Sequence, residues 1–269
     1  MSNQIETKFG LLEPSHTMDG RKRDRKAVEY YESGTLKNIY LENAIEIDTP
    51  AGAVSAEFLT FYEGGNLHRV FPLFGKITGY WTEDDEYSLA QNVDILLPTG
   101  SIVTCKPLCL CFYPSGSLKS LTIWQRSPLK INTPLGAITT VLGASFYESG
   151  ELESIEPLIG TKIQTSIGSA TLYDPDSFPL NADNNSLKFD KSGNLIELST
   201  IHDHLLILKQ DKIVDVINPP ETTSMFFEPV KVLHPLRIRF CPNEISLSTG
   251  SGERKYSLRE FTVKLQRFT

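Results

Sequence analysis

Short apolar stretches that end in an aromatic residue, a polar turn and a leucine recur along the chain. The four clear copies are Tyr30–Leu36, Phe61–Leu67, Phe112–Leu118 and Phe146–Leu152. Weaker copies cover Leu187–Leu195 and, without the glycine, Phe240–Ile245. Aromatic and β-branched residues favour strands, and glycine supplies the positive φ of a tight turn. Each copy of this Tyr-x-Ser-Gly phrase therefore predicts a β-hairpin.

The residues after each leucine break the alternation expected of a regular strand. A further apolar residue follows three positions later, at Ile39, Val70, Leu121, Ile155 and Leu198. Side chains two positions apart share one face of a strand, so a spacing of three places the two apolar residues on different faces. Either the leucine still belongs to the turn, or a β-bulge follows it.

A second phrase, typified by Thr-Pro-x-Gly, lies between copies of the first. It occurs at Ile47–Val54, Ile95–Ile102 and Ile131–Ile138, with a variant that lacks proline at Ile163–Ala170. Proline at the first position of a turn, followed by glycine two residues later, again predicts a tight connection between strands. Two turn types thus alternate along the chain.

This alternation predicts an all-β fold of repeated β-hairpins in an up-and-down meander. Consecutive turns of a meander fall at opposite edges, so we expect the Tyr-x-Ser-Gly turns along one edge and the Thr-Pro-x-Gly turns along the other. Twist accumulates from strand to strand, so a dozen strands form a large curled sheet, layered sheets or a solenoid. The sequence leaves these three arrangements open.

One short helical insertion interrupts the pattern at about residues 73–92. Thr82 precedes a run of acidic residues, and a hydroxyl followed by carboxylates is typical of a helix N-terminus. Tyr173–Asn185 reads as a polar loop, and strands are expected at Leu236–Phe240 and Phe261–Leu265. The predicted organisation is an N-terminal segment over 1–29, a hairpin repeat region over 30–199, and a C-terminal β segment or cap over 200–269.

At the phrase Tyr-x-Ser-Gly-x-Leu-Lys-Ser, the chain resembles the opening of the MORN-variant repeats of bacterial antitoxin-like proteins. In those repeats an aromatic residue, Asn/Ser-Gly and Leu-Lys form a β-hairpin. The resemblance covers only the opening phrase of each repeat, and the Thr-Pro-x-Gly phrase is not part of that pattern. It implies hairpin geometry and a binding role rather than catalysis.

Composition narrows the classes of partner and compartment. The net charge of −7 and pI near 5.3 argue against a nucleic-acid-binding protein, which usually carries positive charge to meet phosphates. We expect no membrane partner, because no stretch approaches the roughly 20 apolar residues of a spanning helix. The first ten residues carry no secretory signal pattern, and the four cysteines are too few and too clustered for a disulfide framework. These features predict a cytoplasmic location.

The acidic cluster in the insertion is the leading candidate for a ligand site. Tyr80 and Trp81 precede Glu83, Asp84, Asp85 and Glu86. Aromatic rings can stack on a sugar while paired carboxylates share proton transfer, so the pattern is compatible with a carbohydrate or small-ligand site, possibly hydrolytic. The structural alternative is that these acids stabilise the start of a helix.

Three other groups of polar residues have structural explanations. Cys105, Cys109 and Cys111 lie in an apolar run typical of a buried strand, so we expect core packing and no metal site. His202 and His204 share a strand face without a third ligand, which favours a surface or edge role. The basic run Gly20–Lys26 is typical of a solvated segment. We expect no cofactor.

Two functional hypotheses follow. The first is a non-catalytic β-repeat scaffold that binds a protein or peptide through a sheet face or edge, because the repeats dominate the chain and no complete catalytic motif occurs. The second is the ligand site at Tyr80, Trp81, Asp84, Asp85 and Glu86. If the insertion is only a cap, replacing Trp81 and Asp85 alters stability and no ligand affinity.

Overall fold

A computed structural model describes residues 4–16, 26–74, 82–173, 182, 185–224, 230–249 and 252–267. These residues are 62% strand and 3% helix. The chain forms two compact units, of which one comprises residues 1–129 and 146–151 and the other residues 130–145 and 152–269. The two are called unit 1 and unit 2 below, and the predicted boundaries after residues 29 and 199 remain predictions about the repeat pattern.

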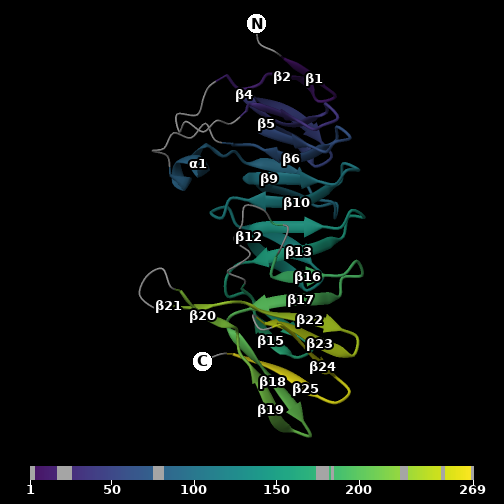
Figure 1. Cartoon of the computed structure of the whole chain (residues 1–269), viewed down its shortest axis with the longest axis vertical. Coiled ribbons are helices and arrows are strands. Elements are labelled where there is room, and N and C mark those ends of the chain that lie inside the picture. Colours follow the sequence, from purple (N-terminus) through teal and green to yellow (C-terminus); the bar gives the residue numbers. More distant parts are fainter. Residues whose placement is uncertain are drawn as a thin grey trace. The chain divides into compact units, whose positions relative to one another are not determined.

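Among the described residues, unit 1 holds ten strands and one helix (Figure 1). Its elements are β1 (Ile5–Thr7), β2 (Gly10–Leu12), β3 (Val28–Tyr30), β4 (Leu36–Thr49), β5 (Gly52–Phe61), β6 (Leu67–Phe71), α1 (Glu83–Leu89), β7 (Val93–Leu96), β8 (Ile102–Cys105), β9 (Pro107–Phe112) and β10 (Leu118–Ile123). Helix α1 lies within the predicted insertion, which is thereby confirmed as helical.

Unit 2 holds the remaining strands. They are β11 (Leu129–Thr133), β12 (Gly136–Phe146), β13 (Leu152–Pro157), β14 (Lys162–Thr165), β15 (Gly168–Thr171), β16 (Leu187–Phe189), β17 (Leu195–Thr200), β18 (Asp203–Lys209), β19 (Lys212–Ile217), β20 (Glu221–Ser224), β21 (Val230–Leu233), β22 (Leu236–Cys241), β23 (Glu244–Thr249), β24 (Gly252–Ser257) and β25 (Thr262–Arg267). The expected strands near Leu236 and Phe261 are therefore present as β22 and β25. Most of the predicted polar loop at 173–185 and of the basic run at 20–26 lies outside the described residues.

The predicted all-β meander is confirmed. Fourteen strands form a large antiparallel sheet that does not close into a barrel. Unit 1 contributes the order β10-β9-β6-β5-β4-β3, and unit 2 contributes β24-β23-β22-β17-β16-β13-β12 with β11 paired to β12. Strands β19, β18 and β25 form a separate three-stranded sheet in that order.

The register of the sheet aligns one apolar residue per strand into a buried row. In unit 1 the partners are Ile39, Leu59, Val70, Leu110 and Leu121, and in unit 2 they are Ile155, Leu187, Leu198, Ile238 and Leu247. Each of these side chains is 0% exposed. The apolar position three residues after each leucine thus supplies the core, and burying such a side chain contributes about 1.5–3 kcal/mol.

The bulge explanation for the irregular spacing is the correct one. Leu36 pairs with Tyr30 and Asn38 with Glu29, so the leucine belongs to the strand and Lys37 is the extra residue. The same shift makes His68 and Lys119 the extra residues of β6 and β10. Lys37 Nζ lies 5.8 Å from the centre of the Tyr31 ring, and Lys119 Nζ lies 5.9 Å from that of Tyr113. The bulge therefore directs a side chain onto the tyrosine of its own turn.

The Tyr-x-Ser-Gly turns share one hydrogen-bond pattern. In the first, the Tyr31 amide donates to Thr35 O at 2.8 Å and the Gly34 amide donates to Tyr31 O at 2.9 Å. Gly34 has φ +83°, a conformation that strains residues with a Cβ. The turns that begin at Tyr62, Tyr113, Tyr147 and Asp190 repeat both bonds.

A ladder of tyrosine hydroxyls joins successive turns of unit 1. Tyr31 Oη donates to Phe61 O at 2.8 Å, and Tyr62 Oη donates to Phe112 O at 2.8 Å. Tyr113 Oη donates to Phe146 O at 2.9 Å. Each hydroxyl binds the carbonyl immediately before the next turn, so these turns lie in one row, as the sequence predicts.

The second turn type is held by a threonine hydroxyl. Thr49 Oγ1 accepts from the Ala51 amide at 3.1 Å and donates to Gly52 O at 2.7 Å. The turns at Thr133 and Thr165 repeat this arrangement, as does one at Thr7 that was not predicted. The assignment of the phrase Ile95–Ile102 to the Thr-Pro-x-Gly turns is wrong. Its Leu97 amide donates to Ser101 O and its Gly100 amide to Leu97 O, the pattern of the Tyr-x-Ser-Gly turns.

The prediction that the two kinds of turn occupy opposite edges is wrong. A Cβ placed on Gly116 would lie 3.9 Å from Pro50 Cγ, and one on Gly193 would lie 3.1 Å from Pro134 Cγ. A straight strand of the length of β5 would separate its two turns by roughly 33 Å. Because Pro50 and Pro134 instead lie close to Tyr-x-Ser-Gly turns or their Asp190 counterpart, the Thr-Pro-x-Gly ends of these hairpins fold back toward that row of turns. The bend in β4 lies where its register shifts, between Tyr40 and Ile45.

Candidate functional site

The acidic insertion is organised around the start of α1. Thr82 is the N-cap, and its hydroxyl accepts the Asp85 amide. The Asp85 carboxylate accepts the Thr82 amide at 2.7 Å and the Thr82 hydroxyl at 2.8 Å, which completes a capping box. These backbone and side-chain hydrogen bonds lower the pKa of Asp85. Asp85 therefore has a sufficient structural role.

The other predicted ligand residues are not brought together by the described structure. Asp84 is exposed and forms an ion pair with Arg126, and Glu86 is half-buried. Tyr80 and Trp81 lie outside the described residues. The carbohydrate-site hypothesis for this cluster stays a prediction, and the helix-capping explanation is confirmed for Thr82 and Asp85.

A cluster that sequence analysis missed holds α1 against the rest of unit 1. Tyr87 packs edge-on to Trp124 with ring centres 6.3 Å apart, and Lys106 Nζ lies 4.1 Å from the centre of the Tyr87 ring. Lys106 also donates to Tyr87 O at 3.1 Å, and Tyr87 Oη donates to Arg126 O at 3.3 Å. These residues are distant in sequence, so no local motif could reveal them.

The cysteines behave as core residues. Cys105, Cys109 and Cys111 are each 1% exposed, and none forms a disulfide. Burial, reinforced by the charge of Asp94, raises the pKa of the Cys105 thiol to about 12. Within the described ranges, no group of three His, Cys, Asp or Glu side chains is placed to hold a metal ion. The same part of the chain contains no helix long and apolar enough to cross a membrane.

Asp203, which lies between His202 and His204, forms the hydrogen bonds that organise this region. It is 1% exposed, and its Oδ2 accepts the Thr171 amide at 2.6 Å and the Thr200 hydroxyl at 3.1 Å. His202 stacks on Tyr173 with ring centres 5.9 Å apart. This arrangement joins β15, β17 and β18 in unit 2.

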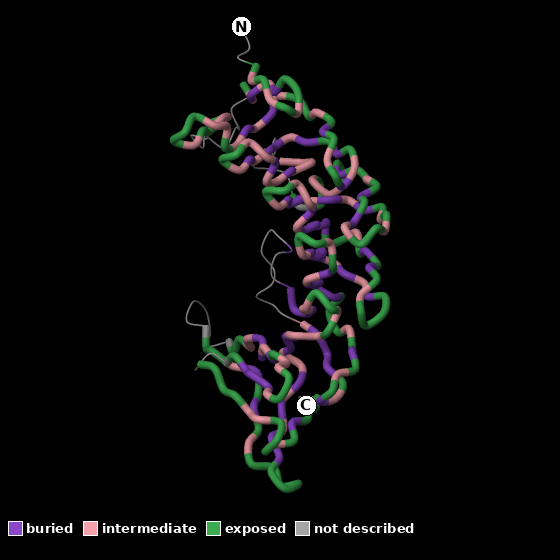
Figure 2. The backbone as a smooth tube through the Cα atoms, turned by 90° about the vertical axis from the view of Figure 1, so that its right-hand side faces the viewer, coloured by how far each residue is buried: buried purple, intermediate pink, exposed green. Residues whose placement is uncertain are grey.

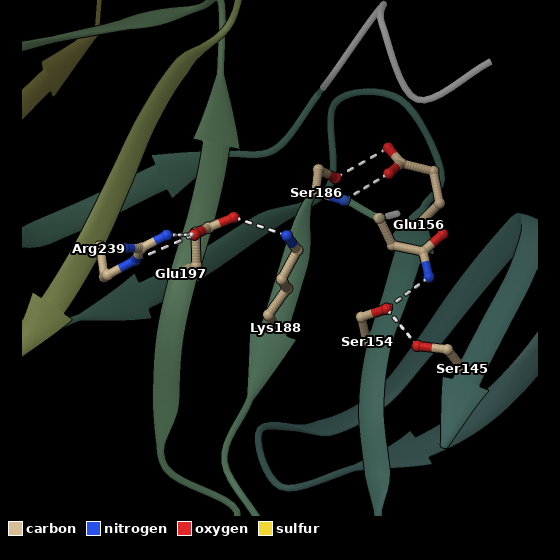
Figure 3. Close-up of polar contacts among 8 residues, drawn as sticks. Ser145, Ser154, Glu156, Ser186, Lys188, Glu197 and Arg239 are labelled. Carbon is tan, nitrogen blue, oxygen red and sulfur yellow. Dashed lines mark hydrogen bonds and ion pairs between the residues drawn. The ribbon is translucent and has the colours of Figure 1, made fainter. Parts of the chain in front are cut away.

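One face of the unit 2 sheet carries a buried polar network (Figure 3). Ser145 and Ser154 share a 2.6 Å hydrogen bond, and Asn185 Nδ2 donates to Ser154 Oγ at 2.7 Å. Glu156, 3% exposed, accepts the Ser186 amide at 2.6 Å and the Ser186 hydroxyl at 2.8 Å. Buried polar groups persist when they are hydrogen-bonded, so this network fixes the strands that carry it.

An ion-pair triad crosses the same face of the sheet. Glu197 lies directly between Lys188 and Arg239 in the register, at 2.8 Å and 3.1 Å from their nitrogens (Figure 3). Burial opposes ionisation of Glu197, but the hydrogen bonds and charges of Lys188 and Arg239 outweigh it and lower the pKa of this carboxyl. The triad satisfies its own charges and offers no unpaired catalytic group.

An exposed edge strand stands out in unit 2. In the described part of the chain, β19 pairs with β18 alone, and its other side faces outward (Figure 1). Ile213, Val214 and Val216 on this strand are 57%, 54% and 45% exposed. Figure 2 colours the end of the β18–β19 hairpin as exposed. The strand thus presents apolar side chains along a side that no other described strand pairs.

Other edges carry features that prevent pairing. Strand β3 has three residues, and β24 at the far end of the large-sheet order carries Glu253, Arg254 and Lys255. The outer side of β25 is covered, because the Leu265 amide donates to Ile167 O at 2.7 Å. Short length, charge and cover are the usual protections of edge strands. Over Ile213 and Val214, strand β19 carries no charge and is covered by no other described strand, although its register with β18 shifts at Val214.

The end of the β18–β19 hairpin is also strained. Gln210 and Asp211 have φ of +51° and +59°, the left-handed region that glycine and asparagine usually occupy in such two-residue turns. Next to the turn, Lys209 and Lys212 pair directly across the two strands, and both are exposed. Like charges opposite one another on a sheet destabilise it.

Asp215 connects β19 to β24. Its Oδ2 accepts the Tyr256 hydroxyl at 2.7 Å and lies 3.4 Å from Arg254 Nη1, while its Oδ1 accepts the Val216 amide at 2.9 Å. Burial, followed by the hydrogen bond to Asp215, raises the pKa of Tyr256. The open part of the edge is therefore Lys212–Val214.

No protein-family model, curated protein or solved structure matches the chain. The resemblance of its turns to MORN-variant repeats stays a prediction, and the function rests on the chain's own geometry.

Proposed function

We propose that the protein is a non-catalytic β-repeat scaffold that binds an extended protein segment by strand addition at β19. The single observation that carries this proposal is the edge of β19, where Ile213 and Val214 are exposed on a side that no other described strand pairs. An added strand forms main-chain hydrogen bonds with such an edge and covers its side chains.

The polar groups of the molecule support a binding role. Asp85 caps a helix, Asp203 joins three strands, and Glu197 is shared between two cations. Each of these carboxylates is engaged in holding the fold.

Fluorescence anisotropy with a labelled eight-residue peptide of alternating valine and threonine tests the proposal. We expect saturable binding to the full chain. Val214→Pro, which removes the N–H and fixes φ at the register shift of β19, should weaken binding at least tenfold, whereas Val214→Thr keeps the N–H and should bind as the wild type does. Ile213→Ser removes apolar contact without changing the backbone and should weaken binding less.

Three results would overturn the proposal. The first is absence of binding to the wild-type chain. The second is equal binding by Val214→Pro and Val214→Thr while both keep the wild-type circular dichroism spectrum. The third is a wild-type dimer in sedimentation equilibrium that Val214→Pro dissociates, because β19 would then pair with a second copy of the chain.

A further inference from the structure

We infer that the segment bound at β19 carries an acidic side chain beside Lys212, so that the site selects acidic over basic extended peptides. This inference rests on the proposed function and specifies its partner. At the open edge, Ile213 and Val214 supply the apolar contact, and the charges around them select the partner.

Lys212 is the unbalanced charge of the edge. It stands directly opposite Lys209 in the hairpin register, so the two ammonium groups repel one another. Lys209 Nζ lies 5.3 Å from the centre of the Phe261 ring, which provides a cation–π partner. The Lys212 ammonium has no hydrogen-bond or ion-pair partner among the described residues.

The nearby carboxylates do not neutralise Lys212. Asp215 is bound to Tyr256, Arg254 and the Val216 amide. Asp211 lies in the turn itself and forms no ion pair within the described part of the chain. A third strand beside β19 places its own side chains next to those of Lys212, so an acid there gains attraction and a lysine adds repulsion.

The position of Asp215 also limits where the third strand can pair. Its carboxylate occupies the Val216 amide, so the added strand forms its hydrogen bonds over Lys212–Val214. The partner residues that meet this segment are therefore close to Lys212. The same few residues of the partner therefore contact both the charge of Lys212 and the apolar side chains of Ile213 and Val214.

Three labelled peptides test the inference. Each has the valine–threonine core of the probe above and carries glutamate, glutamine or lysine at both ends. We expect the glutamate peptide to bind about two- to fivefold tighter than the glutamine peptide, and the lysine peptide to bind more weakly by a similar factor. The differences should shrink as salt is raised, because exposed charges are screened.

Variants of two surface lysines separate a local charge effect from an effect of net charge. Lys212→Glu should reverse the order of the three peptides, and Lys212→Gln should remove it. Lys130→Glu makes the same charge change at an exposed position on β11 and should leave the order unchanged. These substitutions are on the surface, so each variant is expected to fold.

The outcomes distinguish the inference from the proposed function. Equal affinity of the three peptides, with no effect of Lys212→Glu, would overturn the inference while leaving strand addition in place. An order that Lys130→Glu changes as much as Lys212→Glu does would also overturn it. Failure of all three peptides to bind would overturn both.

Discussion

Replacing Tyr31 by phenylalanine removes one step of the tyrosine ladder and nothing else from the turn. The Tyr31 hydroxyl is partly buried and donates to Phe61 O at 2.8 Å. A neutral hydrogen bond of this kind contributes about 0.5–1.5 kcal/mol to stability. The ring remains, so its packing under Lys37 is kept. We expect Tyr31→Phe to lower the free energy of unfolding by about 1 kcal/mol.

The adjacent tyrosine provides a matched control. Tyr30 is 53% exposed, and its hydroxyl has no partner among the described residues. Tyr30→Phe makes the same chemical change one position away and should alter the free energy of unfolding by less than about 0.5 kcal/mol, as surface substitutions usually do.

Urea unfolding followed by circular dichroism measures both variants. With a dependence on urea of about 2–3 kcal/mol per molar, a loss of 1 kcal/mol lowers the midpoint by roughly 0.3–0.5 M. The slope should stay constant, because the surface exposed on unfolding does not change. A midpoint for Tyr31→Phe equal to that for Tyr30→Phe would refute the ladder as a source of stability.

Three further predictions concern unit 2 and use the same measurement. Gly193→Ala should lower the free energy of unfolding by about 1 kcal/mol or more beyond the loss caused by Gly160→Ala. The two glycines have φ of +82° and +83°, but only a Cβ on Gly193 would lie 3.1 Å from Pro134. Equal losses of stability in the two variants would contradict the contact with Pro134. Asp211→Gly should stabilise by about 0.5–1 kcal/mol, because φ at this position is +59°, and a loss of stability would contradict the strain. The stability that Glu197 contributes should be present above its ordinary pKa near 4.5 and be lost as pH falls through the lowered folded value. The gap between the wild type and Glu197→Gln should therefore narrow below pH 4.5, and a constant gap would contradict the triad.

The turns could be predicted from the sequence because their determinants are local. Glycine with positive φ, as at Gly34, and the threonine hydroxyl of Thr49 act within four residues of chain. The buried row was also predictable, because Ile39 and Val70 keep a fixed distance from the leucine before them. Such features depend on a residue and its immediate neighbours.

The bends and the open edge were not predictable, because they depend on contacts between residues that are far apart in the sequence. The register shift between Tyr40 and Ile45 carries no proline or glycine, and the approach of Pro50 to Gly116 joins residues far apart in the sequence. The apolar run of β19 reads like a core strand in the sequence. Its exposure is set by its place at the end of a three-stranded sheet, which only the pairing of distant strands reveals.

Amide hydrogen exchange at Ile213 and Val214 tests strand addition most directly. The full chain is measured alone and with the valine–threonine peptide at saturating concentration. Strand addition predicts slower exchange at these amides with the peptide, and no slowing in Val214→Pro at Ile213. Unchanged exchange at Ile213 and Val214, or protection confined to another edge such as β24, would contradict β19 as the docking strand.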